Sequence, residues 1–108
     1  MQTNIRAVHF TLDDNLREHI EGKLKRIDYA ADDIVDPTIT LTLDARQFDG
    51  EAHLHFRWGA TKNVTAHGHD AVPVADQLLD KLSAVVAKEK DKLKSTHTRH
   101  GPTAETPG

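Results

Sequence analysis

Three lysines near the end of the chain recur at helical spacing and have the charge needed to bind a polyanion. Residues 70–94 carry apolar side chains at the spacing of an amphipathic helix, and Lys81, Lys88 and Lys92 share a narrow stripe beside the apolar face. Rows of lysine match the phosphates of a nucleic-acid backbone, and such binding releases counterions. The plainer alternative is a solvated helix face, where lysines near the C-terminus also favour the helix dipole.

A second basic row is predicted on an earlier helix, over residues 12–27. Its members are His19, Lys23 and Arg26, which lie together along one edge of the apolar stripe. If both helices cover the same side of a sheet, the two rows could form a cationic cleft. The formal net charge of the chain is −3, so nucleic-acid binding would depend on such local patches.

Histidines occur in two His-x-His pairs, His53 with His55 and His67 with His69, on stretches typical of neighbouring strands. Outward-facing residues on an antiparallel pair can lie about 5 Å apart. Imidazoles at that separation could bind zinc, copper or nickel. The alternative is a polar, open sheet face, because His-x-His alone is a weak motif and the chain has no cysteine.

Motifs for catalysis are missing from the sequence. It has no nucleophile elbow, phosphate loop or HExxH motif, and its serines, Ser83 and Ser95, both fall on the last predicted helix. Trp58 alternates onto the apolar side of its strand, which favours packing over base stacking. We therefore expect a non-enzymatic protein that needs no cofactor.

The elements that must position these side chains follow in the order β-α-β-β-β-α. Strands are predicted at residues 3–10, 38–43, 52–58 and 62–68, with N-caps for the two helices at Thr11 and Asp70. Residues 44–50 are predicted as a turn ending in Asp-Gly. Gly22, inside the first helix, should cost about 1 kcal/mol relative to alanine and could allow a neighbour to approach closely.

This order predicts an α+β fold. A helix between the first two strands indicates a right-handed crossover and a parallel pair, and short turns make the later strands antiparallel. Each strand has one apolar face, so both helices should pack on one face of a four-stranded mixed sheet.

Residues 1–95 are predicted to form one domain, and residues 96–108, rich in Thr, Pro and Gly, a disordered tail. An acidic loop is expected at residues 29–37, where reversing Asp32, Asp33 and Asp36 should leave any polyanion binding unchanged. No stretch is apolar enough for a membrane span or a signal peptide, which favours a cytoplasmic protein.

Four stretches in order give the chain a family resemblance: MQTNIRAVHFTLDDNLREHIEGKLKRI, ITLTLD, LHFRWGATKNVTAHGHD and DQLLDKLSAVVAKEKDKLK. With these stretches, spread over residues 1–94, the chain resembles the short ribosome hibernation-promoting factors, also called ribosome-associated inhibitors or ribosomal subunit interface proteins. One departure is Ser83-Ala84, which stands where family members often carry Arg-Gln and so removes a cation.

The resemblance implies docking on the small ribosomal subunit, where mRNA and tRNAs would otherwise lie, and inhibition of translation under stress or in stationary phase. The implied partners are that subunit and its rRNA, with no membrane or DNA, and a separate ribosome modulation factor as an open further partner. The positions that match rRNA-binding residues of the family are Arg17, Lys23, Arg26, Lys81, Lys88, Lys90, Lys92 and Lys94.

Two questions stay open at this stage. Long family members have a second, dimerising domain, and we expect no ribosome dimerisation through such a domain from residues 1–108; whether the protein promotes or opposes dimerisation in another way is undecided. Two other functions also fit the residues: a metal-binding module that uses the histidine face, and a generic double-stranded-RNA-binding domain built on β-β-β-α with a lysine-bearing last helix.

Overall fold

The structure, a computed structural model, describes residues 3–98, with side chains up to Lys92. Its elements are β1 (Asn4–Val8), α1 (Asp14–Leu24), the 3-10 helix η1 (Lys25–Asp33), β2 (Ile34–Asp44), β3 (Gln47–Phe56), β4 (Thr61–Gly68) and α2 (Ala71–Thr98). None of the described helices is long and apolar enough to cross a membrane.

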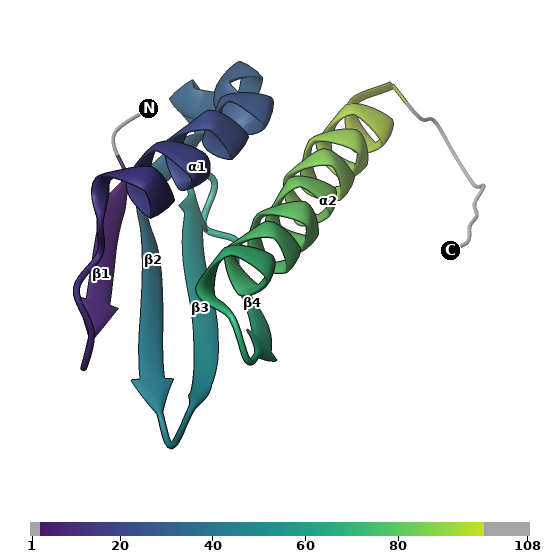
Figure 1. The fold of residues 1–108 in the computed structure, drawn as a ribbon. Helices are drawn as coiled ribbons and strands as arrows, with labels where there is room; N and C mark the ends of the chain where they lie inside the picture. Colours follow the sequence, from purple (N-terminus) through teal and green to yellow (C-terminus); the bar gives the residue numbers. More distant parts are fainter. Residues whose placement is uncertain (1–2, 99–108) are drawn as a thin grey trace.

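The strands form one mixed sheet in the order β1-β2-β3-β4. β1 runs parallel to β2, and the other two pairs are antiparallel. Both helices lie on the same side of this sheet, with α2 across β3 and β4 and α1 beside it (Figure 1). The predicted fold class, strand directions and one-sided helix packing are therefore confirmed.

The core lies between the sheet and the two helices. Alternate strand residues point into it, including Ile39 and Leu41 of β2 and Leu54 and Phe56 of β3. The helices add their apolar stripes, which are buried at Leu16, Ile20, Leu24, Val74, Leu78, Leu82 and Val86. Burying one such side chain contributes roughly 1.5–3 kcal/mol, so this layer supplies most of the favourable free energy of folding.

The first helix differs from its prediction at both ends. Its N-cap is Asp13 rather than Thr11, because the Asp13 carboxylate accepts a 2.8 Å hydrogen bond from the backbone N–H of Leu16. The chain then continues as η1 where an acidic loop was expected. Residues Ile27, Ala30 and Asp33 are buried at intervals of three, the period of a 3-10 helix, which keeps this segment against the core.

The second strand begins earlier than predicted, at Ile34 rather than Thr38. Its pairing with β3 shifts between Val35 and Thr38, and Asp36 adopts a positive φ of 49° there. Pro37 lacks an N–H and cannot join the ladder, so it is tolerated at this bulge. The sequence-based prediction began the strand after Pro37 because proline usually interrupts a strand, and it therefore missed residues 34–37.

The turn between β2 and β3 is tighter than predicted. Ala45 and Arg46, with φ of 49° and 68°, make a two-residue hairpin connection.

Gly50 lies within β3, where an added Cβ would approach Leu78 Cδ2 to 3.1 Å and Val74 Cγ1 to 3.2 Å. The glycine therefore lets α2 pack closely on the sheet.

Gly22 has the opposite environment, and the expectation of a close neighbour there is wrong. An added Cβ would meet nothing within 4 Å, and the residue is exposed on α1. We expect Gly22→Ala to raise the free energy of unfolding by about 0.5–1 kcal/mol, since alanine loses less backbone entropy in a helix. Thermal unfolding should show a higher Tm. Gly50→Ala is the matched comparison and should lower it.

The last helix begins as predicted after Asp70, whose carbonyl oxygen accepts a hydrogen bond from the Val74 N–H. It continues past Ser95 to Thr98, so the first residues of the predicted tail are helical. Residues 99–108, the rest of that predicted tail, lie outside the described residues.

Candidate nucleic-acid interface

The lysine row, Lys81, Lys88 and Lys92, lies on the flank of α2 that faces the β4 edge of the sheet, and all three residues are exposed. Lys81 shows which flank of α2 carries the row, because its Nζ donates a 2.6 Å hydrogen bond to the carbonyl oxygen of Thr65 in β4. Lys88 follows seven residues after Lys81, and Lys92 four residues after Lys88. Both spacings return to the same face of a helix. The predicted stripe is therefore present and open to solvent.

The second basic row, made of His19 and Lys23 of α1 and Arg26 of η1, meets α2 on a different flank. Lys23 Nζ lies 3.1 Å from Asp80 Oδ1 and 3.5 Å from Asp76 Oδ1, and Arg26 Nη1 lies 3.1 Å from Asp80 Oδ1. His19 Nε2 also contacts Asp76. The prediction of a cationic cleft between the two helices is therefore wrong, because the basic edge of α1 packs against the acidic flank of α2.

The basic side chains at this contact lower the pKa of Asp76. Burial acts to raise the pKa of Asp76, but the hydrogen bond and positive charge of His19, with the charge of Lys23, lower it below its ordinary value. The carboxylate thus stays ionised between the helices. Lys23 is only 19% exposed, so its ammonium group is largely used in holding α1 against α2.

Asp33 is a buried carboxylate that joins three elements. Its Oδ2 accepts a 2.6 Å hydrogen bond from Lys90 Nζ, and its Oδ1 accepts a 2.7 Å bond from Arg57 Nε. These hydrogen bonds, Lys90 first, hold the pKa of Asp33 below its ordinary value against the opposing effect of burial. Lys90 therefore lies off the lysine row and ties α2 to η1.

Glu89 is the second buried carboxylate, on the sheet side of α2. Its Oε2 accepts a 2.9 Å hydrogen bond from Trp58 Nε1, and its Oε1 lies 3.7 Å from Lys62 Nζ. The Trp58 bond, and then the charges of Lys62 and Lys92, lower the pKa of Glu89 although burial opposes them. The Trp58 ring stacks on Phe56 at 5.0 Å, so the interpretation of Trp58 as a packing residue is confirmed.

Two basic residues near this surface were missed by sequence reasoning. Arg57 and Lys62 flank the β3–β4 turn and reach the C-terminal half of α2 through Asp33 and Glu89. Their position on either side of the Gly59 turn was the available signal, but it did not show which helix the turn would meet. Of the other predicted positions, Arg17 is exposed on α1, and the side chain of Lys94 lies outside the described residues.

His53, His55 and His67 lie on the open face of the sheet and His69 follows the end of β4, but the strand register separates the two pairs. His53 pairs with Asn63, whereas His67 pairs with Asp49. At about 3.3 Å per residue, His67 therefore lies roughly 13 Å along β3 from His53. Within the described part of the chain, no three His, Asp or Glu side chains gather closely enough to hold a metal ion. The metal-binding alternative required the two pairs to meet, and the β3–β4 register keeps them apart.

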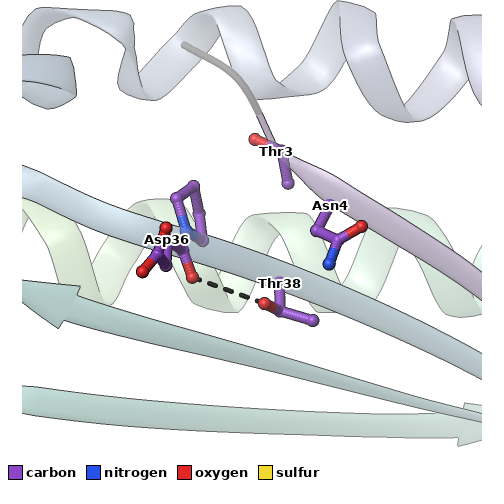
Figure 2. Close-up of a pocket in the computed structure, with 5 residues that line it drawn as sticks. Thr3, Asn4, Asp36 and Thr38 are labelled. Atoms are coloured by element: carbon purple, nitrogen blue, oxygen red, sulfur yellow. Dashed lines mark hydrogen bonds between the residues drawn. The ribbon is translucent and has the colours of Figure 1, made fainter.

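A polar hollow lies where the start of β1 meets the bulge of β2 (Figure 2). Thr3 and Asn4 line one side, and Asp36, Pro37 and Thr38 line the other. The Thr38 hydroxyl donates a 3.3 Å hydrogen bond to the Asp36 carbonyl oxygen, which helps to hold the bulge. These groups can hydrogen-bond to a ligand, but the hollow is distant from the lysine row along the sheet, at the opposite edge strand.

The family model described as sigma 54 modulation protein / S30EA ribosomal protein matches residues 3–94. The chain belongs to this family. It is 31% identical over 94 residues to the ribosome hibernation promoting factor of Escherichia coli K12, covering 87% of this chain and 98% of the relative.

Solved structures of related proteins share the fold. A ribosomal subunit interface protein from Coxiella burnetii superposes with a TM-score of 0.74 at 26% identity, covering 84% of this chain and 99% of that one. The N-terminal domain of protein Y from Thermus thermophilus superposes with a TM-score of 0.68 at 21% identity, covering 80% and 94% of the two chains, which shows the fold alone. The resemblance found in the sequence is thereby confirmed at the level of the family.

Proposed function

We propose that this protein is a non-enzymatic translation inhibitor that docks on the small ribosomal subunit and promotes ribosome hibernation under stress or in stationary phase. Its family membership and the printed names of its relatives support this function. The observation that carries the proposal is the lysine row, which is exposed along one flank of α2 and directed away from α1.

In this proposal the lysine row contacts phosphates of the rRNA. Lys88 and Lys92 are one helical turn apart, about 6 Å along the axis, and Lys81 lies about 10 Å before Lys88. Ammonium groups at these intervals can neutralise successive or alternate phosphates along a strand and release their counterions. Such contacts supply affinity, while the shape of the ribosomal channel supplies specificity.

The other predicted contacts have a second role in the fold. Lys23, Arg26 and Lys90 each pair with a carboxylate of the protein, so RNA would have to share these cations with Asp80 or Asp33. Their replacement should therefore change helix packing as well as binding. Arg17 and Lys94 complete the proposed set, Arg17 being exposed on α1.

Co-sedimentation with purified small ribosomal subunits over a salt series tests this function. With at least three phosphate contacts, log K should fall against log salt with a slope of about −2 to −3 or steeper. In vitro translation should be inhibited over the same protein concentrations. Failure to bind at low salt would exclude the proposal.

A free RNA hairpin is the control ligand. Ribosomal docking depends on the shape of a channel as well as on charge, so the hairpin should bind more weakly than the subunit. Equal affinity for the hairpin and the subunit would instead favour a generic double-stranded-RNA-binding domain.

A further inference from the structure

Lys62, the second residue of β4, lies beside the C-terminal half of the lysine row. Its Nζ is 3.7 Å from Glu89 Oε1, and the side chain is 37% exposed. Lys92 acts electrostatically on the same Glu89 carboxylate and lowers its pKa together with Lys62. Two cations distant in the sequence are therefore gathered around one buried carboxylate on the β4 side of α2.

Glu89 lies among basic side chains from two elements. Lys62 and Lys92 both act on its carboxylate, and the exposed Lys88 lies one helical turn before the exposed Lys92 on the same face of α2. We name these three residues the Lys62–Lys88–Lys92 cluster. An ammonium group has three N–H donors, so Lys62 can turn one toward Glu89 and still offer others to an anion.

The neighbouring packing holds Lys62 in place. Glu89 is 6% exposed, and its other oxygen is fixed by the Trp58 indole N–H at 2.9 Å. Trp58 is itself stacked on Phe56 in the core layer. A lysine held by a buried carboxylate loses less side-chain entropy when an anion binds than a lysine on an open helix face does.

We propose that Lys62 is a further phosphate-binding residue, and that the RNA-contacting surface continues from α2 onto the start of β4. The inference rests on the proposed function and adds a strand to a surface that sequence reasoning confined to the two helices. The ligand is the phosphate backbone of RNA, because the cluster offers ammonium groups and Trp58 is already engaged in packing.

The test compares Lys62→Gln with the wild-type protein for binding to small ribosomal subunits over a salt series. The loss of one phosphate contact should reduce the steepness of log K against log salt by about 1 and weaken binding about eightfold at 0.1 M salt. Lys62→Arg keeps the charge and should restore both values.

Arg46→Gln is the matched control, because it removes one exposed cation from the turn at the other end of β3 and should change neither value. If Lys62→Gln weakens binding without changing the salt slope, Lys62 acts through Glu89 and Trp58 and the inference is wrong. An unchanged affinity would also overturn it while leaving the proposed function in place. Absence of wild-type binding would overturn both.

Discussion

Reversing the charge of the lysine row with Lys81→Glu, Lys88→Glu and Lys92→Glu should abolish binding to the small ribosomal subunit. Each lost phosphate contact removes about 0.9 from the slope of log K against log salt, so three together weaken binding by about 500-fold or more at 0.1 M salt. The three residues are exposed and lie outside the core, so the fold should survive although the hydrogen bond from Lys81 Nζ to the Thr65 carbonyl oxygen is lost. Co-sedimentation at low salt measures the loss.

Charge reversal also makes the whole protein more negative, which needs a control. Arg6→Glu, Lys25→Glu and Arg46→Glu produce the same change in net charge at exposed positions on β1, η1 and the β2–β3 turn. This variant should bind far better than the lysine-row variant at every salt concentration. If the two variants lose binding equally, overall charge rather than the row governs binding, and the proposed interface is wrong.

The acidic segment around the start of β2, Asp32 to Asp36, is unsuitable as a neutral comparison, contrary to the sequence-based expectation. Asp32 and Asp36 are exposed, but Asp33 is buried between Arg57 and Lys90. Reversing Asp33 would place a third cation beside these two and destabilise the fold. A loss of binding in that variant would then report unfolding rather than an RNA contact.

Asp33→Asn should lower the free energy of unfolding by about 2 kcal/mol at neutral pH. Two hydrogen bonds to charged groups are weakened, each worth about 1.5–3 kcal/mol. The net loss is smaller than their sum, because water screens the exposed Arg57 and because burial of the Asp33 charge itself costs free energy. Urea unfolding followed by the fluorescence of Trp58, the single tryptophan, measures the change.

The effect of Asp33→Asn should depend on pH in a defined direction. The pKa of Asp33 is lowered in the folded protein, so the stability it contributes is present above its ordinary value of 3.8 and is lost as the pH falls through the folded pKa. The wild-type and variant curves should therefore converge in acid. Asp32→Asn, at an exposed neighbour, should match the wild type throughout. A constant difference between Asp33→Asn and the wild type at all pH values would contradict the ion-pair explanation.

Local periodicity in the sequence determined most of the fold. Alternation at Ile39 and Leu41 and at Leu54 and Phe56 identified strands with one apolar face, and the helical period of residues 70–94 identified α2. Because short connections and crossover handedness restrict the topology, the order β-α-β-β-β-α was enough to give the mixed sheet. Two boundaries were predicted wrongly. The N-cap of α1 is Asp13 instead of Thr11, since both residue types can cap a helix, and β2 begins before Pro37 because a bulge accommodates the proline.

The candidate site was determined only in part by the sequence. Helical spacing placed Lys81, Lys88 and Lys92 on one stripe, but it could not show that α1 would pack against Asp76 and Asp80. It likewise could not set the β3–β4 register, which separates the histidines and brings Lys62 to Glu89. Periodicity fixes which residues share a face of an element. Which neighbour meets that face depends on contacts between residues far apart in the chain, and these form only when the helices pack on the sheet.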